Sequence, residues 1–258
     1  MNPDSKIKLL AVCVISHERP EFLQLQMQSL LPLTDHRDLV TTYIFDNSVI
    51  SSRVVAELSQ RYRVCLLSTP GSSQAENFRK LLEIEPHSYY MLLHDDDITI
   101  LYDVFSFLSE LRRSQSSLSL FYVPSITIKD DLLKVFASHT RLIRKPPLGN
   151  SIVPWVVPAF SSWIYPHTPE LFDSFQNHFI ARPLGKFSDV LFIDRLIQSL
   201  SSRDDFKILK NRYALNVLRW HPGQDSWSPD YGLRFRLISS LTYKLSLIHI
   251  SEPTRRYA

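Results

Sequence analysis

Three consecutive carboxylates are the side chains of this sequence best suited to chemistry. Asp95, Asp96 and Asp97 follow the apolar run 89–93, with only His94 between. The run predicts a buried strand, and the triplet then lies at its carboxyl end. On an extended chain, side chains two residues apart point the same way, about 6 to 7 Å apart. We therefore expect Asp95 and Asp97 to share one hard divalent cation, Mg²⁺ or Mn²⁺, which would relieve their repulsion.

A helix N-terminus is the competing interpretation of the triplet. Aspartate is favoured at helix caps, and the segment 101–111 has a helical pattern of apolar residues. One aspartate is enough for a cap, so three in a row favour the cation site.

Strands and helices alternate in the first hundred residues, and these elements must position the triplet. Continuous apolar runs predict strands at 9–15, 41–45, 64–67 and 89–93, and helical patterns occupy 20–31, 53–61 and 73–84. We expect Phe22, Leu25 and the pair Leu30 and Leu31 to share the buried face of the first helix. The alternation predicts an α/β fold of the Rossmann-like type, with a mostly parallel central sheet flanked by helices.

The pattern loosens after residue 111 and predicts a less regular C-terminal half. Strands are expected at 118–123 and 151–157, among many prolines. We expect one domain over 1–246, which divides into an N-terminal half (8–100), a second half (101–228) and a C-terminal helix (229–246).

Two further polar clusters follow predicted strands and should meet the triplet at one edge of the sheet. The first strand ends in Ser16-His17-Glu18-Arg19-Pro20 and the second in Asp46-Asn47-Ser48. Ligands of open α/β sheets bind at this carboxyl edge. Asp46 can accept hydrogen bonds from a base or ribose, although Asp-Asn-Ser is also an ordinary turn sequence. The chain has only five glycines and no glycine-rich phosphate loop, so side chains and metal would hold a nucleotide.

Four segments together resemble a known family. Val14 to Pro20 (Val-Ile-Ser-His-Glu-Arg-Pro), Phe45 to Ser48, Ala75 to Phe78 and His94 to Asp97 resemble the family 2 glycosyltransferases of the GT-A fold, of the bacterial-polysaccharide type. The run from Leu218 to Ser226 is similar to the closing motif of that family. The resemblance covers roughly residues 8 to 228. It implies that 8–100 is a nucleotide-binding half and that 101–228 is an acceptor-side half.

The resemblance implies a hexosyltransferase-type enzyme with an inverting, metal-assisted mechanism. The sugar would move from a nucleotide-diphosphate sugar, with UDP-sugars favoured, to a hydroxyl of a glycan or lipid-linked glycan in polysaccharide or glycan biosynthesis. Asp189 matches the place of the general base, where the usual Glu-Asp pair is reduced to Ser188-Asp189. Asp194, one turn later, remains an alternative base, and Asp189 could instead be a helix cap. His221 would join Asp95 and Asp97 at the metal or hydrogen-bond the β-phosphate.

The implied nucleotide-sugar-binding residues come from all the segments that carry the resemblance. They are Ser16, His17, Arg19, Asp46, Asn77, Arg79, Asp95 and Asp96. Two other functions stay open at this point. A metal-dependent sugar nucleotidyltransferase would also use an α/β sheet with carboxylates, but it normally has a glycine-rich first loop. A non-catalytic carbohydrate-binding relative is the other alternative, because of the change at Ser188.

Composition narrows the classes of protein further. The chain has 258 residues, 44% hydrophobic content and a net charge of +3, and it has no nucleic-acid-binding motif, so we expect no nucleic-acid partner. Cys13 and Cys65 lie in apolar runs, which is typical of buried packing thiols, and they form no CxxC pair.

The ends of the chain bear on location. The polar N-terminus and the lack of a long apolar stretch predict a cytoplasmic protein. Leucines at helical spacing over 231–245 favour a segment that packs on the core, and they leave open a peripheral contact with the inner face of the membrane. The segment 247–258 resembles translated sequencing adapter, and we expect it to be a non-native tail.

Overall fold

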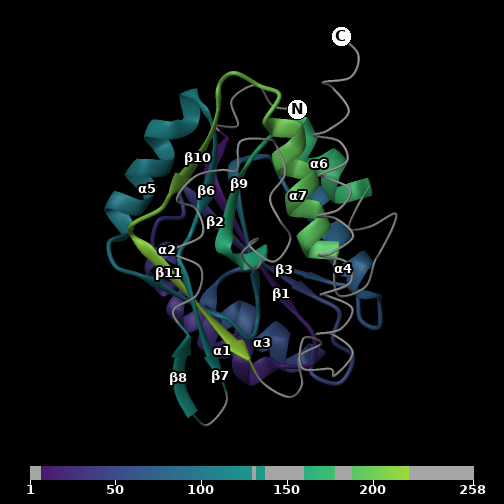
Figure 1. Cartoon of the computed structure of the whole chain (residues 1–258). Coiled ribbons are helices and arrows are strands. Elements are labelled where there is room, and N and C mark those ends of the chain that lie inside the picture. Colours follow the sequence, from purple (N-terminus) through teal and green to yellow (C-terminus); the bar gives the residue numbers. More distant parts are fainter. Residues whose placement is uncertain (1–6, 130–131, 137–159, 178–187, 221–258) are drawn as a thin grey trace, which may run out of the picture.

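The computed structural model describes residues 7–129, 132–136, 160–177 and 188–220 (Figure 1). Its strands are β1 (Lys8–Ser16), β2 (Val40–Asp46), β3 (Cys65–Ser68), β4 (His87–His94), β5 (Ile98–Leu101), β6 (Leu118–Tyr122), β7 (Ser125–Lys129), β8 (Leu132–Phe136), β9 (Trp163–Pro166), β10 (Phe206–Lys210) and β11 (Ala214–Trp220). Its helices are α1 (Pro20–Ser29), α2 (Leu31–Thr34), α3 (Ser52–Tyr62), α4 (Gln74–Arg79), α5 (Val104–Arg113), α6 (Pro169–Phe175) and α7 (Ser188–Leu200), with short 3₁₀ turns at Lys80–Leu82, Ser114–Ser116 and Phe160–Ser162.

Seven strands form the central sheet, in the order β10-β6-β9-β4-β1-β2-β3. The neighbours β4, β1, β2 and β3 run parallel, as do β10 and β6. Strand β9 is antiparallel to both of its neighbours, β4 and β6. The predicted mostly parallel α/β sheet is therefore confirmed, with one reversed strand inside it. A second sheet has the order β5-β11-β7-β8.

Helices cover both faces of the central sheet, which explains why its middle strands are continuous apolar runs. Along β1, Ala11, Cys13 and Ile15 face a core shared with α6 and α7. Leu10, Val12 and Val14 face the opposite core, shared with α1, α3 and α5. Figure 1 shows α4, α6 and α7 on one side of the sheet and α1, α3 and α5 toward the other. Such a three-layer arrangement leaves the strand ends as the places where polar groups can gather.

The first helix buries a different face from the one expected. Leu23, Gln26 and Met27 are its buried residues, followed by Leu30, whereas Leu25 and Leu31 are exposed. The spacing is helical, but one member of the stripe is polar. Gln26 is accepted there because its amide oxygen receives the backbone N–H of Thr99 and its amide nitrogen donates to the hydroxyl of the same residue.

The two cysteines differ in environment. Cys13 is fully buried in the middle of β1, and burial raises the pKa of its thiol well above the ordinary value. Cys65 is exposed, so the expectation of two buried thiols is wrong for this residue. The reason is that β3 is the last strand of the sheet and is only partly covered. The side chain of Trp163, in β9, is also buried in the core.

Two predicted elements lie outside the described residues. They are the strand at 151–157 and the C-terminal helix at 229–246, and the same holds for the tail at 247–258. The strand predicted at 118–123 is present as β6.

Candidate functional site

The parallel register brings the polar strand ends together at one edge of the sheet. Ser16, the last residue of β1, pairs with Asp46, the last residue of β2, and Ile15 pairs with His94 at the end of β4. The backbone N–H of Asp95 then donates to the carbonyl of Ile15 at 3.0 Å. The acidic triplet and the segment after β1 are therefore neighbours, as the sequence predicted from the strand ends.

The triplet forms a tight turn between β4 and β5. The backbone N–H of Asp97 lies 3.4 Å from the carbonyl of His94, and β5 begins directly afterwards. The extended geometry assumed for Asp95 and Asp97 is therefore wrong, because the chain reverses within the triplet. The alternative of a helix cap is wrong as well, since α5 is capped by the side chain of Asp103.

All three carboxylates of the turn are buried, with exposed fractions of 3%, 4% and 5% for Asp95, Asp96 and Asp97. Burial, together with the negative charge of Asp96, raises the pKa of Asp95 to about 7. Burial and the same neighbour raise the pKa of Asp97 well above its ordinary value. The turn thus concentrates negative charge where water does not screen it.

Two groups from the loop after β1 partly offset this charge. The Arg19 guanidinium lies 2.8 Å from a carboxylate oxygen of Asp96 and 3.5 Å from one of Asp95. The backbone N–H of His17 donates to the other oxygen of Asp95 at 3.1 Å. Both interactions lower the pKa of Asp95 against the effect of burial. Predicted residues of two separate segments, one after β1 and one after β4, are therefore in direct contact.

Glu18 holds this loop against the start of α3, a role that sequence reasoning missed. Its carboxylate accepts the backbone N–H groups of Val49, Ile50 and Ser51 at 2.5, 2.9 and 2.9 Å, and the Ser51 hydroxyl at 2.9 Å. These hydrogen bonds lower the pKa of Glu18 to about 2. The residue has a φ of 52°, which is uncommon for a residue other than glycine. Such local strain persists only where surrounding contacts maintain it.

His17 and Asn47 connect the same loop to the end of β2. The Nδ1 atom of His17 lies 2.9 Å from the amide oxygen of Asn47, whose amide nitrogen donates to the Ser72 carbonyl. The backbone N–H of Glu18 donates to the Ser48 hydroxyl at 2.8 Å. Loops after β1, β2 and β3 therefore form one hydrogen-bonded unit.

Asp46 is fully buried, and its carboxylate is engaged inside the protein. One carboxylate oxygen accepts the backbone N–H and the hydroxyl of Ser48, at 3.1 and 2.6 Å. The other lies 3.3 Å from the Ser68 hydroxyl. The turn role that the sequence left open for Asp46 is thus present, while a contact of Asp46 with a base or ribose stays a prediction.

A second unpredicted residue, Lys80, lies beside Asp46. Its ammonium group donates to the Asp46 carbonyl at 2.5 Å and to the Asn77 amide oxygen at 2.7 Å. Asn77 donates in turn to the Phe45 carbonyl at 3.0 Å. Helix α4 starts in a capping box between Ser73 and Glu76, which places Asn77 and Lys80 one turn apart on one side. That spacing of three residues was the available signal in the sequence.

A cavity of about 280 Å³ adjoins this network at the end of β3. Its lining includes Ser68, Thr69, Ser72, Glu76, Arg79 and Lys80. Arg79, predicted to contact the nucleotide, is exposed and lines this cavity. The walls combine cations, carboxylates and hydroxyls, which suits a polar ligand.

For the remaining predicted residues, the structure describes no side-chain position. Asp189 is the second residue of α7, but its side chain and that of Asp194 are outside the described part. His221 lies outside the described residues. Within the described ranges, no three His, Cys, Asp or Glu side chains are clustered in a way that could hold a metal ion.

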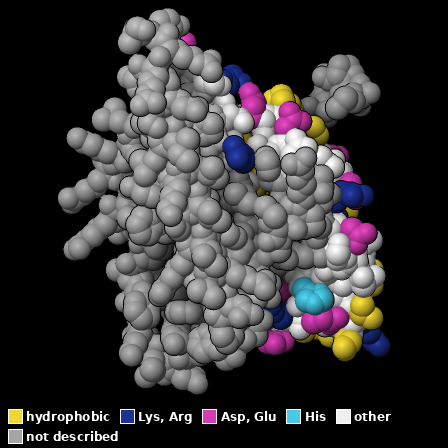
Figure 2. All heavy atoms as spheres, turned by 45° about the vertical axis from the view of Figure 1, so that its right-hand side comes forward, with side chains coloured by type: hydrophobic (Ala, Val, Ile, Leu, Met, Phe, Trp, Pro, Cys, Tyr) yellow, Lys and Arg dark blue, Asp and Glu magenta, His cyan; other side chains and the backbone are white. Residues whose placement is uncertain are grey.

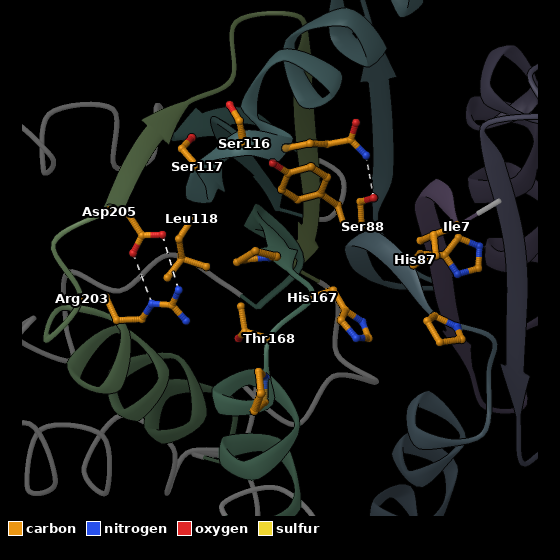
Figure 3. Close-up of a pocket in the computed structure, with 15 residues that line it drawn as sticks. Ile7, His87, Ser88, Ser116, Ser117, Leu118, His167, Thr168, Arg203 and Asp205 are labelled. Atoms are coloured by element: carbon orange, nitrogen blue, oxygen red, sulfur yellow. Dashed lines mark hydrogen bonds and ion pairs between the residues drawn. The ribbon is translucent and has the colours of Figure 1, made fainter. Parts of the chain in front are cut away.

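A larger cavity, of about 390 Å³, lies at the opposite edge of the sheet (Figure 3). Its walls include Ser88, His167 and Thr168, and Arg203 on one side is ion-paired with Asp205. His87, at the start of β4, also lines it, whereas the acidic turn follows His94 at the other end. The eight residues of β4 span about 23 Å between this cavity and the acidic turn. This cavity is therefore distinct from the carboxyl-edge site.

The described surface carries interspersed charge. Figure 2 shows lysine and arginine side chains scattered among acidic ones, without a continuous basic patch on the described part of that face. Among helices of the described ranges, none combines the length and apolar character needed to cross a bilayer.

Comparisons with known proteins were made by sequence and by structure. No protein-family model matches the chain, and no curated protein matches it in sequence. Solved structures of S. aureus TarS do match. The 1–349 structure aligns with a TM-score of 0.57 at 14% identity, covering 90% of this chain and 64% of that one. The complex of TarS 1–349 with UDP-GlcNAc gives 0.56 at 13% identity, with coverage of 89% and 65%. The complex with UDP gives 0.54 at 10% identity, with coverage of 83% and 61%.

These matches show a shared fold. The chain has the α/β fold of the glycosyltransferase TarS, which confirms the predicted fold class. It spans less than two thirds of the length of the TarS structures that it matches.

Proposed function

We propose that this protein is an inverting family 2 glycosyltransferase that uses a nucleotide-diphosphate sugar. The carrying observation is the buried acidic turn beside the loop after β1, at the carboxyl edge of a sheet that has the TarS fold. A UDP-sugar is the favoured donor, since TarS structures with the same fold were solved with UDP and with UDP-GlcNAc. The acceptor is a hydroxyl of a glycan or lipid-linked glycan.

The donor would lie across the edge from the β3 side to the acidic turn. Asp46 and Asn77 are assigned to the nucleoside, and Arg79, which lines the cavity of about 280 Å³, is assigned to the phosphates. Ser16, His17 and Arg19 are assigned to the diphosphate. Arg19 suits this role because a guanidinium presents several N–H donors in a planar fork that matches phosphate oxygens. Asp95 and Asp96 complete the set, with Asp96 nearest to the sugar.

The acidic turn has the chemistry of a site for Mg²⁺ or Mn²⁺. Its raised pKa values come from buried carboxylates close to one another, and a divalent cation is the partner that relieves such crowding. Asp95, Asp97 and His221 would hold the ion, which would offset negative charge on the leaving nucleoside diphosphate. Arg19 already supplies positive charge to Asp95 and Asp96, so it would have to turn toward the donor phosphates.

Transfer is a single displacement at the anomeric carbon. The acceptor oxygen forms a bond to that carbon as the bond to the diphosphate breaks, and the hydroxyl proton passes to the Asp189 carboxylate. General-base catalysis of this kind typically contributes about 10² to 10⁴-fold in rate. Attack from the face opposite to the leaving group inverts the configuration.

Nucleotide binding gives the first test. Isothermal calorimetry with UDP, GDP and dTDP, each with and without Mn²⁺, should show binding of one nucleotide that Mn²⁺ strengthens. Asp95→Asn should abolish the Mn²⁺ effect, while Asp205→Asn, in an exposed ion pair far from the edge, should leave it unchanged. A protein that binds none of the nucleotides would refute the proposal. Metal-indifferent binding would refute the cation model alone.

Turnover gives the second test, because it separates the base from the binding residues. Asp189→Asn should retain nucleotide affinity and lose about 10² to 10⁴-fold in kcat. Asp194→Asn is the matched control on the same helix, and loss of kcat there instead would move the base to Asp194.

A further inference from the structure

The side chain of Lys80 is the least expected feature of the carboxyl edge. Lysine is almost never buried without partners, yet Lys80 is only 4% exposed. It follows α4 in the 3₁₀ turn Lys80–Leu82. Its ammonium group donates to two acceptors, the Asp46 carbonyl and the Asn77 amide oxygen. A buried ammonium group needs such acceptors, because burying a charge without hydrogen bonds is costly.

Asn77 passes this contact on to two strands. Its amide nitrogen lies 3.0 Å from the Phe45 carbonyl of β2 and 3.5 Å from the Ser16 carbonyl of β1. With the amide oxygen occupied by Lys80, the orientation of Asn77 is set, since only its nitrogen can then donate to the strands. One ammonium group therefore fixes Asn77 and the end of β2 together.

Lys80 also faces the place where a ligand can enter. It lines the cavity of about 280 Å³ with Ser68 and Arg79. Ser68 in turn contacts the Asp46 carboxylate. Moving Lys80 would thus disturb the cavity wall, the Asn77 amide and the last residue of β2 at once.

We propose that Lys80 is a positioning residue of the donor site, whose ammonium group holds Asn77 and the end of β2 in the arrangement that binds the nucleotide. This inference rests on the proposed function, and it concerns the affinity for the nucleotide rather than the chemical step. Lys80 acts through Asn77 and Asp46, so its loss should raise the donor KM and leave kcat nearly unchanged.

The charge of Lys80 is sensitive to pH in an accessible range. Burial lowers the pKa of Lys80 to about 8, against the opposing effect of the Asp46 and Glu83 carboxylates. Glu76 and Arg79 of α4 are the other charged groups on the same cavity. A neutral amine keeps two N–H donors but loses the charge-assisted strength of its hydrogen bonds. Nucleotide affinity should therefore weaken, without disappearing, between pH 7 and 9.

The test compares Lys80→Met with Lys80→Gln and with the matched control Lys207→Met, an exposed lysine on β10. Circular dichroism and thermal unfolding first establish that each variant folds. Calorimetry with UDP and steady-state kinetics then give Kd, the donor KM, the acceptor KM and kcat. Lys80→Met should raise the Kd and the donor KM at least tenfold, with kcat and the acceptor KM within threefold. Lys80→Gln should lie between Lys80→Met and the unmodified protein.

The pH titration supplies a readout that a merely structural role would not change. The weakening of UDP binding between pH 7 and 9 should be present in the unmodified protein and in Lys207→Met, and absent from Lys80→Met. If Lys80→Met does not fold, Lys80→Gln and the titration of the unmodified protein carry the test. Folded Lys80 variants with the affinity and pH profile of the unmodified protein would overturn the inference alone. An unmodified protein that binds no nucleotide would overturn the proposed function and this inference with it.

Discussion

Asp95→Asn should stabilise the metal-free protein at pH 8, although the residue is assigned to function. Burial raises the pKa of Asp95 from 3.8 to about 7, so its ionised form is disfavoured in the folded state. Each pKa unit corresponds to about 1.36 kcal/mol, which sets a ceiling of roughly 4 kcal/mol on the penalty at pH 8. The amide loses the ion pair with Arg19 at 3.5 Å, so a net gain of about 1 to 3 kcal/mol is expected.

The sign of the pH dependence follows from the direction of the shift. Between pH 3.8 and 7 the folded protein binds more protons at Asp95 than the unfolded chain does. The stability contributed by this group is therefore present in acid and is lost as the pH rises through about 7. The advantage of Asp95→Asn should fall to less than half at pH 5.

Urea unfolding in EDTA at pH 8 and pH 5 measures both quantities. At pH 8 the gain corresponds to a rise in melting temperature of about 2 to 10 °C. Asp205→Asn is the control, because it removes a carboxylate from an exposed ion pair with an arginine, without burial. An equal gain at both pH values, or a destabilised Asp95→Asn protein at pH 8, would refute this account of the acidic turn.

Two further predictions concern the loop after β1. Arg19→Gln should lower the free energy of unfolding at pH 8 by about 1 to 3 kcal/mol, because it removes the guanidinium charge that offsets two buried carboxylates. Arg53→Gln, in an exposed pair, should change it by less than about 0.5 kcal/mol, and urea titrations at pH 8 compare the two variants. Glu18→Gln should destabilise the protein near neutral pH. Since the folded pKa of Glu18 is depressed to about 2, that difference should be present above pH 4.5 and should vanish as the pH falls through about 2. An acid series of urea midpoints that shows no such convergence would contradict the role of Glu18 in holding this loop against the start of α3.

The strands of the sheet were predictable because both of its faces are covered. The run 9–15 is apolar at every position, and it forms the middle of β1 (Lys8–Ser16). The same reasoning located β4 and the carboxylates that follow it. The buried face of α1 was not predictable in this way. Gln26 lies in its apolar stripe, and only the distant Thr99 explains why a polar side chain is stable there.

The candidate site was predictable as a set of strand ends and was not predictable as a geometry. Order along the chain indicated that Ser16, Asp46 and Asp95 meet at one edge, since parallel strands share their carboxyl ends. The turn within the triplet depends on where β5 pairs, and β5 pairs with β11, more than a hundred residues later. Sequence periodicity contains no information about such a partner.

By itself, the sequence determined the α/β class, the positions of the main strands and the presence of carboxylates after β4, because these depend on local patterns of burial. Tertiary structure alone decided that Arg19 pairs with Asp95 and Asp96, that Asp46 is occupied by Ser48 and Ser68, and that a buried Lys80 holds Asn77. The physical reason is that hydrogen bonds and ion pairs act over about 3 Å. Which groups come that close is settled only when strands distant in sequence are packed side by side.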